Sequence, residues 1–583
     1  LSVSLKVFLA KVLETCRKQE LANHGEGFWS DHWTYNLDMI ESYLAVYPET
    51  LGDLLLKQKI FHFFHNTHYV LPRDRRYILT DRGVRQYGSV ANNGSGTDGN
   101  LLRTKSGHGD VYVTNLVCKL LCLIANKVAS LDPSGIGVEM EADKPNWYDA
   151  LNGLPGLLGS SVSETFELKR LGAFLSEALA KVRIKDNATV PIFEELANFI
   201  SGLTHVLAFE SDTLGYWKKS NDLKEHYRAY VRQGIEGNEI DIPVSEIRHF
   251  LDLIAARTDK GIRAAKNSKG YLATYFYHDV VKYESLEKHD REDGDVFVRP
   301  LKFRKHVLPL FLEGYVHALR VEKNHANAKK LYNQVRKSDL FDKKLKMYKV
   351  NADLSGESEE IGRTRIFPAG WLENESIWLH MEYKFILELL RGEMYEEFYT
   401  NLHAALVPFL KPEEYGRSVL ENCSFLVSSA HEDKALHGQG FIARLSGSTA
   451  EFMHIWLLMN IGKDPFAVSA KGALTLTFKP ALAGALFTKK ESTVVYRDAK
   501  DNRKSVKLPK NSYTFNLFGT TLVVYHNPRR RNTFGANKPS IKEMRFTYPG
   551  KGKPVVISAR FVSGAHARDI RDGKVERVDV FFG

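Results

Sequence analysis

Cysteine is scarce in this chain, whose 583 residues include only four, at positions 16, 118, 122 and 423. So thin a distribution excludes the disulfide framework of a small secreted domain and favours a reducing, cytoplasmic compartment. Cys118 and Cys122 stand four residues apart in an apolar stretch, without the further Cys or His that a zinc site needs. We therefore expect them to pack a helix, and we expect neither a metal nor a cofactor.

Long apolar runs and basic arms are also lacking. No run reaches the roughly 18 residues of a membrane-spanning helix, and no secretory signal is recognisable, so no membrane partner is expected. The 81 Lys and Arg residues are scattered among 70 Asp and Glu, for a formal net charge of +11. Short basic stretches such as 502–510 and 529–531 are typical of solvated loops. Nucleic acid is therefore not expected, whereas a phosphate ligand is compatible with this balance.

Helical periodicity is abundant in the first four fifths of the chain. The hydrophobic content of 43% is enough for a large core and more than one domain. Up to about residue 466, apolar residues recur at i, i+3 and i+4. This spacing predicts paired helices, as in an α-helical barrel or a large bundle, over residues 5–19, 38–56, 111–128, 162–179, 193–207, 243–256, 307–323, 373–391, 394–409 and 449–461.

From about residue 470 the pattern changes to short alternating strands. Gly, Asn and Pro turns separate them, which is typical of a small β-sandwich. The expected strands cover residues 474–479, 492–497, 513–517, 521–526, 543–547, 554–561 and 577–582. We therefore predict a mainly α catalytic domain over residues 1–468 and a C-terminal β-sandwich domain over residues 469–583.

The segment Lys144–Gly153 places one carboxylate, Asp149, among aromatic and amide side chains. Trp147 and Tyr148 offer flat faces to a sugar ring, and Asn152 offers a donor and an acceptor to hydroxyls. Partial desolvation beside such rings favours the protonated carboxyl at neutral pH, as a general acid that cleaves a glycosidic bond requires. The alternative is a turn in which Asp149 caps the next helix.

A second aromatic segment, Gly25–Tyr35, precedes the expected helix at 38–56. It carries Trp29, Asp31 and Trp33, a combination that suits the wall of a carbohydrate site. The alternative is a loop that packs its aromatic side chains into the core.

A third segment, Gly370–His380, leads into the expected helix at 373–391. Asn374 and Trp378 are four residues apart and would share one helical face, with His380 within reach and Glu373 near the helix start. His380 could bind an anion or a sugar hydroxyl, although a lone helical His is more often structural.

A fourth region ends in the turn Ser446, Gly447 and Ser448, just before the expected helix at 449–461. Free backbone N–H groups, hydroxyls and the positive end of a helix suit an anion. The Gly-x-x-x-x-Gly-Lys pattern of a nucleotide-binding loop is absent, so no nucleotide is inferred. An ordinary helix cap is the alternative.

The order and approximate spacing of these segments resemble those of inverting disaccharide and oligoglucan phosphorylases, namely the cellobiose phosphorylase family and its relatives, the β-1,3-glucan phosphorylases. The family's acid motif Asp-Trp-Asn-Asp-Gly-Met-Asn looks like residues 146–152, with Asp149 at the place of the catalytic aspartate. Its Glu-Asn-Gly-Gln-Tyr-Thr-His segment looks like residues 373–380, so His380 would inherit phosphate binding.

The family's Thr-Gly-Ser-Ala-Gly-Trp-Met loop looks like residues 446–453, which places Ser446 and Gly447 at phosphate-contacting positions. Departures such as Asn146 for an acid, Ala150 for Gly and Glu451-Phe452 for Gly-Trp argue against cellobiose phosphorylase itself. Residues 28–33, 416–422 and 444–449 look more like the larger β-glucan phosphorylases.

This resemblance implies a six-hairpin (α/α)6 barrel over residues 20–465, followed by a jelly-roll-like β-sandwich. The family's N-terminal β-sandwich and linker helices have no counterpart here, so we expect the chain to be part of a longer polypeptide. Family relatives are often homodimers, which makes a homodimer the expected assembly.

The implied reaction is the reversible phosphorolysis of β-1,3-linked glucan oligosaccharides to α-glucose 1-phosphate and a shortened glucan. Asp149 would protonate the departing oxygen while inorganic phosphate, the co-substrate, attacks the anomeric carbon. Phosphate would be held by His380, Ser446, Gly447, Ser448, Arg417 and Gln439, Arg being suited to bidentate contact with phosphate oxygens. The predicted substrate-binding residues are Trp29, Asp31, Trp33, Trp147, Tyr148, Asn152, Glu373, Asn374, Trp378 and Glu421.

Two alternatives stay open because a fold does not fix a function. The first is an inverting glycoside hydrolase or transglycosylase, which needs a base about 6.5–9.5 Å from the acid; Glu373 and Glu421 are its candidates. The second is a non-catalytic carbohydrate-binding protein.

Overall fold

The computed structural model describes residues 3–16, 33–66, 68–92, 100–141, 144, 146–286, 296–442, 447–498, 502–550 and 552–583. Each stretch that was expected to be helical contains a helix. The α-helices are α1 Leu5–Thr15, α2 Trp33–Val46, α3 Leu116–Val128, α4 Val162–Val182, α5 Glu194–Phe209, α6 Thr213–Val231, α7 Val244–Ala264, α8 Leu312–Val321, α9 His325–Lys337, α10 Leu379–Arg391, α11 Tyr395–Ala405, α12 Pro412–Tyr415, α13 Ser448–Ile461 and α14 Ala565–Arg571.

Helix α3 shows why the apolar periodicity succeeds. Asn115 caps its first turn by accepting the N–H of Cys118 at 2.8 Å, which satisfies one of the free donors at a helix start. The helix buries Leu120, Leu121 and Ile124 on one side. Cys118 is buried and all four cysteines are free, so the prediction that this pair packs a helix is confirmed.

Strands are more frequent before residue 466 than the sequence suggested. They are β1 Phe61–His62, β2 His68–Val70, β3 Tyr77–Thr80, β4 Gly83–Gln86, β5 Val90–Asn92, β6 Val113–Thr114, β7 Val138–Glu139, β8 Ser160–Ser161, β9 Thr189–Phe193, β10 Glu239–Pro243, β11 Tyr275–Ser285, β12 Val296–Val307, β13 Phe341–Asp342, β14 Met347–Tyr348, β15 Ile377–Trp378, β16 Phe425–Leu426 and β17 Gly440–Phe441. A six-stranded sheet has the order β4-β3-β12-β11-β8-β7. The fold is therefore mixed α and β, which corrects the mainly α prediction.

The C-terminal part contains strands where the alternating pattern predicted them. They are β18 Phe466–Val468, β19 Leu474–Leu476, β20 Ser492–Arg497, β21 Arg503–Leu508, β22 Ser512–Leu517, β23 Thr521–His526, β24 Ile541–Thr547, β25 Val555–Ile557, β26 Val562–Ser563 and β27 Arg577–Phe582. Five of them form a sheet of order β22-β23-β27-β24-β25. Strands β23 and β27 are parallel, whereas a jelly roll is built from antiparallel strands.

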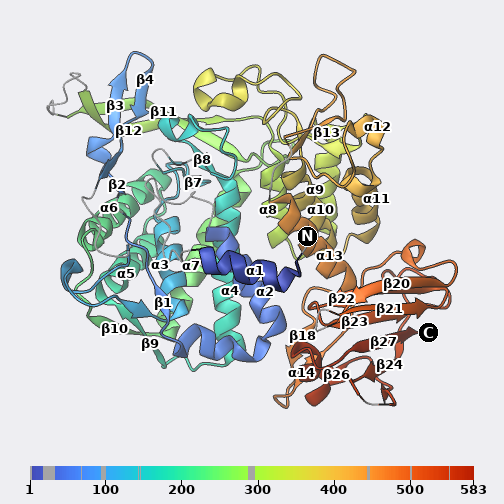
Figure 1. Cartoon of the computed structure of the whole chain (residues 1–583). Helices are drawn as coiled ribbons and strands as arrows, with labels where there is room; N and C mark the ends of the chain where they lie inside the picture. The colour runs from blue at the N-terminus through green and yellow to red at the C-terminus, as the bar shows by residue number, and fades with distance from the viewer. Residues whose placement is uncertain are drawn as a thin grey trace.

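The buried apolar residues form several clusters, and one of them lies entirely within residues 461–582. In Figure 1 this C-terminal part, coloured orange to red, lies at the lower right beside the end of α13, on the other side of the molecule from α5 and α6. Helix α14 of this part contacts the end of α2. Arg571 of α14 donates to the carbonyl of Val46 at 3.0 Å and pairs with Glu49 at 2.7 Å, which ties the C-terminal part to the end of α2.

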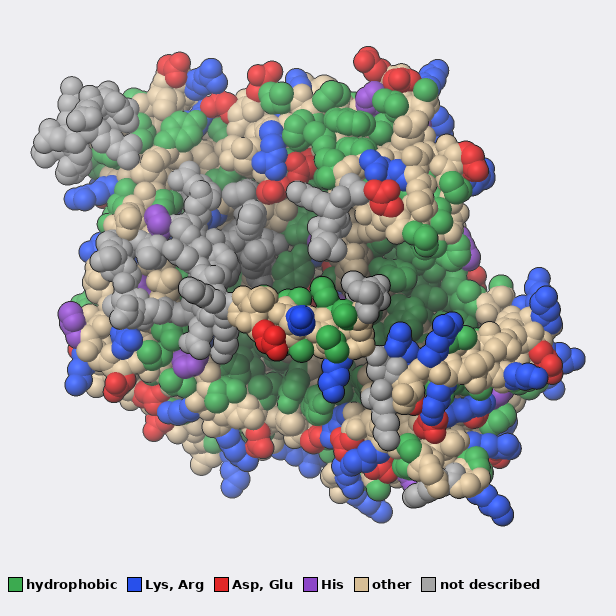
Figure 2. Space-filling view, in the orientation of Figure 1, with side chains coloured by type: hydrophobic (Ala, Val, Ile, Leu, Met, Phe, Trp, Pro, Cys, Tyr) green, Lys and Arg blue, Asp and Glu red, His purple; other side chains and the backbone are tan. Residues whose placement is uncertain are grey.

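Helix α1 lies on an open face of the molecule. None of its residues is buried, and Leu13 is 72% exposed. Figure 2 shows α1 crossing the middle of this face, with hydrophobic side chains lining the hollows beside it. Among the described residues, no helix has both the length and the apolar character needed to cross a membrane.

Candidate active site

Two carboxyl groups share one arginine at the centre of the candidate site. Oδ1 of Asp149 lies 3.1 Å from Nη2 of Arg363, and Nε of the same guanidinium donates to Oε2 of Glu373 at 3.2 Å. The two carboxyl groups are near enough for Asp149 to raise the pKa of Glu373. The structure thus brings the acid-motif segment and the start of the third segment together around a cation that the sequence analysis did not identify.

Burial decides which carboxyl of this pair carries a proton at neutral pH. The side chain of Glu373 is 12% exposed, against 36% for Asp149. Burial, followed by the hydrogen bond and the negative charge of Asp149, raises the pKa of Glu373 to about 7, against the opposing effect of Arg363. A pair of adjacent carboxyl groups that shares one proton is a source of acid near neutral pH, and here the raised pKa lies on Glu373.

A close contact between two loops places Arg363. The N–H of Arg363 donates to Oδ1 of Asn152 at 3.0 Å, and the N–H of Thr364 donates to the carbonyl of Ala150 at 3.1 Å. Gly153 is required here, because a methyl group on it would come within 1.9 Å of the carbonyl of Glu360. Asn152, predicted to bind substrate, therefore helps to hold the loop that carries the shared arginine.

Tyr148 is corrected from a substrate-binding residue to a core residue. Its side chain is fully buried, and its ring packs edge-on against Tyr275 and Phe311. Its hydroxyl lies within hydrogen-bond distance of two acceptors for its one proton, Asn351 Oδ1 at 3.1 Å and the carbonyl of Glu373. Tyr148 therefore fixes the backbone on both sides of the carboxyl pair without being accessible to a sugar.

Aromatic rings pack on one another in the two segments that carry the carboxyl pair. The rings of Trp147 and Trp378 have centroids 4.5 Å apart, and Trp378 also packs on Phe425 at 5.0 Å. Trp147 is partly exposed whereas Trp378 is 9% exposed. Trp147 is accordingly the ring that could stack on a sugar, and the buried Trp378 packs against it.

The third segment is not helical, which corrects the argument that Asn374 and Trp378 share a helical face. Residues 377–378 form the short strand β15, which pairs with β16, and α10 begins only at Leu379. Asn374 is buried and bonds to Asn351 and to the carbonyl of Phe367. It stabilises the loop, whereas His380 in the first turn of α10 faces the site.

His380 connects the acid segment to the fourth segment. Its ring lies edge-on to Trp147 with centroids 5.2 Å apart. A methyl group on Gly447 would lie 1.9 Å from Cε1 of His380, so the start of α13 touches the imidazole. The turn and the acid motif, 300 residues apart in the chain, therefore meet through one histidine.

Glu451 and Lys384 complete this corner. Nε2 of His380 lies 3.5 Å from Glu451 Oε1, and Lys384 Nζ lies 3.9 Å from the same atom. Burial opposes the charge of Glu451, but the hydrogen bond to His380 and the charge of Lys384 outweigh it and lower its pKa to about 2. Burial likewise opposes the charge of Lys384, while Tyr35 and Glu451 outweigh it and raise its pKa.

The remaining predicted phosphate ligands have protein partners. Ser448 is buried, and its Oγ accepts from Asn422 at 2.6 Å. Arg417 donates to the carbonyl of Gly440 at 2.7 Å and pairs with Glu421 at 2.8 Å. The amide group of Gln439 donates to the carbonyl of Ala435. Arg417, Glu421 and Gln439 thus border the β16–β17 strands without a described contact to His380.

The aromatic segment Gly25–Tyr35 falls largely outside the described residues. Trp29, Asp31 and Ser446 lie outside them. Trp33 is 7% exposed and belongs to an apolar cluster with Leu37 and Leu55, so it is a core residue and its assignment to the substrate is corrected. Tyr35, two residues later, accepts a hydrogen bond from Lys384 at 3.3 Å, which brings the end of the segment Gly25–Tyr35 to the site.

Sequence reasoning missed Arg363, Lys384 and Tyr35 as parts of the site. Arg363 follows Gly362 in a loop without a recognisable pattern, and Lys384 is hidden inside an amphipathic helix. A signal did exist for Glu451, since a carboxylate at the first turn of a predicted anion-binding helix is unexpected. Among the described residues, no group of three or more His, Cys, Asp or Glu could hold a metal ion.

No protein-family model and no curated protein matches this chain. Among solved structures, a GH63 mannosylglycerate hydrolase from Thermus thermophilus, solved in complex with glucose, aligns at 9% identity and a TM-score of 0.26, covering 78% of this chain and 100% of that one. An uncharacterized conserved protein from the same organism aligns at 10% identity with the same TM-score and coverage. At this level the likeness carries no information on family or activity.

Proposed function

We propose that this chain is a carbohydrate-active enzyme that cleaves a glycosidic bond with a proton held by the Asp149–Glu373 pair. The observation that carries the proposal is this pair, bridged by Arg363, with the partly exposed Trp147 two residues before Asp149 in the chain. Glu373, with a pKa of about 7, keeps a proton available to Asp149. The exposed member of the pair, Asp149, delivers it to the leaving oxygen.

The finer proposal is inverting phosphorolysis of β-1,3-linked glucan oligosaccharides. Inorganic phosphate would lie between His380, Lys384 and the N-terminus of α13, where backbone N–H groups favour an anion. It attacks the anomeric carbon as the bond to the leaving sugar breaks, and the leaving oxygen receives the proton. The products are α-glucose 1-phosphate and a shortened glucan, and the reverse reaction extends the glucan.

Phosphorolysis is favoured over hydrolysis because neither candidate base of a hydrolase, Glu373 or Glu421, is suitably placed. Glu373 and Asp149 contact the same guanidinium at 3.2 and 3.1 Å, and a pair that shares one proton leaves no room for the water that an inverting hydrolase places between its acid and its base. Glu421 is neutralised by Arg417 at 2.8 Å. Phosphate needs no such base, because it is already a competent nucleophile.

Hydrolysis remains the second candidate because of Glu451. This carboxylate is ionised and lies 3.5 Å from His380, in the region proposed for phosphate. An ionised carboxylate repels an anion and can instead activate a water. Glu451 is therefore the residue whose replacement separates the two reactions.

The fold and the assembly follow as part of the same proposal. The helices from α2 to α13 would close into an (α/α)6 barrel over residues 1–468, with residues 469–583 as a separate domain and a homodimer as the assembly. A crystal structure of the chain would show whether six helical hairpins form a closed ring.

Phosphate dependence is the test. The purified chain would be incubated with laminarin oligosaccharides, with and without inorganic phosphate, and glucose 1-phosphate and free glucose measured; β-1,2- and β-1,4-linked glucans define the linkage. Asp149→Asn serves as the inactive control. We expect glucose 1-phosphate only when phosphate is present. Cleavage that is indifferent to phosphate would establish a hydrolase, and activity unchanged in Asp149→Asn would reject the acid.

A further inference from the structure

A cavity of about 600 Å³ opens beside α6, away from the carboxyl pair. None of its described lining residues belongs to the candidate active site. Its walls come from the segment 63–72, from the C-terminal half of α6 and from residues 141 and 144. Its volume lies within the range typical of small-molecule sites, which makes it large enough for a ring compound.

The cavity has an excess of positive charge. Of its described lining residues, Arg76, Lys144, Lys224, Arg228 and Arg232 are basic, whereas only Glu141 and Glu225 are acidic. This excess of three cations calls for an anionic ligand.

The two carboxylates are already engaged. Arg228 pairs with Glu141 at 2.6 Å, while Glu225 is shared by Arg73 at 3.0 Å and Arg76 at 3.7 Å. Nε of Arg76 is buried without a hydrogen-bond partner among the described residues. A buried guanidinium N–H without a partner costs free energy that a ligand oxygen could recover.

Lys224 adds a buried positive group. Its side chain is 3% exposed and its Nζ lies 2.9 Å from the hydroxyl of Ser130. Burial lowers its pKa to about 8, against the opposing charge of Glu141. An anion in the cavity would favour the charged form of this lysine.

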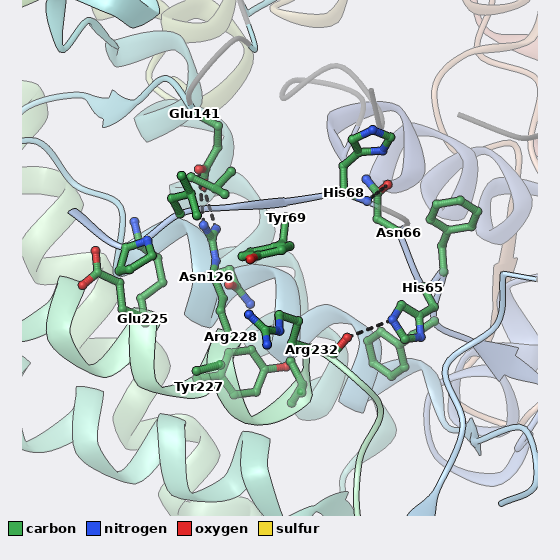
Figure 3. A pocket seen from close by; sticks show the side chains of 18 of the residues that line it. His65, Asn66, His68, Tyr69, Asn126, Glu141, Glu225, Tyr227, Arg228 and Arg232 are labelled. Carbon is green, nitrogen blue, oxygen red and sulfur yellow. Dashed lines mark hydrogen bonds and ion pairs between the residues drawn. The ribbon is translucent and has the colours of Figure 1, made fainter. Parts of the chain in front are cut away.

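Aromatic and apolar side chains form the other wall. Phe63, Tyr69, Leu102 and Phe193 line it, and the guanidinium of Arg232 stands over the ring of Tyr69 at 4.7 Å. Figure 3 shows Tyr69 between the Glu141–Arg228 pair and the region of His65, with Arg232 beside it. A flat ring could rest on this wall while an attached anion faces the arginines.

We propose that this cavity binds a phosphate monoester carried on a ring, either a sugar phosphate or a mononucleotide. Arginine forks match phosphate oxygens, the apolar wall takes the ring, and the volume fits both parts together. The site is independent of the chemistry proposed at Asp149.

Calorimetry on the full chain tests the site. Glucose 6-phosphate and AMP would be titrated separately, with glucose, adenosine and inorganic phosphate as controls. At least one monoester should bind, and neither its unphosphorylated counterpart nor inorganic phosphate should match it. Binding of glucose 6-phosphate alone would identify the ligand class as a sugar phosphate, and binding of AMP alone would identify it as a mononucleotide. Binding of both would show that the cavity recognises the phosphate monoester and ring that they share. Inorganic phosphate can also bind at the proposed active site, so it is compared between the wild type and Arg232→Ala. Failure of both monoesters, or equal affinity for glucose or adenosine, overturns the proposal.

Variants locate the bound ligand. Arg232→Ala changes an exposed side chain and should weaken binding about tenfold through loss of a charged hydrogen bond, with an unchanged melting temperature. Arg76→Leu changes a buried arginine of the cavity and should also weaken binding. Lys219→Ala lies on the same helix outside the cavity and, like Asp149→Asn, should bind normally. Retained affinity in both arginine variants, or loss in Asp149→Asn, places the ligand elsewhere and overturns the site.

Discussion

The imidazole of His380 lies directly against Gly447, with no room for a side chain on the glycine. A methyl group there would come within 1.9 Å of Cε1 and 2.2 Å of Nε2 of the ring, well inside van der Waals contact. This contact fixes the imidazole of His380 against the start of α13, where the candidate anion site lies. A substitution at Gly447 tests it.

Gly447→Ala should displace the imidazole and lower turnover on β-glucan about 100-fold, because small misplacements of site groups have effects of that size. Overpacking should also lower the free energy of unfolding by about 1–3 kcal/mol. Gly172→Ala in α4 is the control: no atom lies within 4 Å of its added methyl, so stability should rise by up to about 1 kcal/mol. Steady-state kinetics and urea unfolding measure both. An active Gly447→Ala protein would contradict the contact.

Glu373→Gln should remove a pH dependence of stability. The folded-state pKa of Glu373 is about 7, above the ordinary 4.5, so the folded chain binds the extra proton between these values. Its stabilising effect is complete below about pH 4.5 and is lost as the pH rises to about 7, by roughly 3 kcal/mol at most. Urea unfolding at pH 5 and pH 8 should show a smaller difference in Glu373→Gln than in the wild type.

The same proton should appear in the kinetics. Activity that depends on a proton held by Glu373 falls as the pH rises through about 7, and this basic limb should be missing from the residual activity of Glu373→Gln. An unchanged limb in the variant would assign the proton to another group.

Glu451→Gln separates the two proposed reactions. In phosphorolysis, removing the charge relieves repulsion of the anion, so the apparent KM for phosphate should fall, by roughly two- to tenfold. In hydrolysis with Glu451 as base, turnover should instead drop by at least about 100-fold. Glu413→Gln, an exposed carboxylate on α12, should change neither value.

Tyr148→Phe should affect stability rather than sugar binding. It removes a buried hydroxyl that donates to Asn351, at a cost of about 1–2 kcal/mol in the free energy of unfolding. Trp147→Ala should weaken oligosaccharide binding instead, since the ring is partly exposed beside the carboxyl pair. Tyr87→Phe, where the ring is 46% exposed, should be nearly neutral. If Tyr148→Phe lost affinity for the oligosaccharide at unchanged stability, Tyr148 would be a substrate-binding residue after all.

Asp38→Asn should destabilise the chain by about 1–3 kcal/mol, because it removes a charged partner from two buried guanidinium groups, although Arg170 keeps Glu41 and Glu167. Asp38 pairs with Arg170 and Arg320. Burial opposes its charge, but Arg320, Arg170 and Arg391 outweigh it and lower its pKa, so this stability is present above about pH 4 and is lost on acidification. Asp53→Asn, with a side chain 58% exposed, is the matched control in thermal unfolding.

Apolar periodicity predicted helices such as α3 and α13, but not α6. Helix α6 buries Ser220, Asn221 and Lys224 beside its aromatic residues, so its inner face does not read as an apolar stripe. Helix α9 was missed for a different reason, since its buried stripe is only Ala328, Tyr332 and Val335 within an otherwise polar segment. The long hairpin β11–β12 was overlooked because strand pairing is a non-local interaction that no window of sequence contains.

The candidate site was predictable in its residues more than in their roles. The segments around Asp149, Glu373, His380 and Gly447 do meet, which their composition suggested. Arg363 could not be foreseen, since its place depends on a contact between two loops far apart in the chain. The partition of roles between Trp147 and Tyr148 also depends on burial, because adjacent residues of similar chemistry face opposite ways.

The contact of Arg571 with the carbonyl of Val46 joins residues 525 positions apart. During synthesis the N-terminal partner emerges from the ribosome long before the other exists, and domains generally begin to fold in that order. The end of α2 therefore lacks its contact with Arg571 until nearly the whole polypeptide has been translated. A chain truncated by a few dozen residues at its C-terminus would keep both residues of the carboxyl pair, but it would leave the end of α2 accessible to proteases.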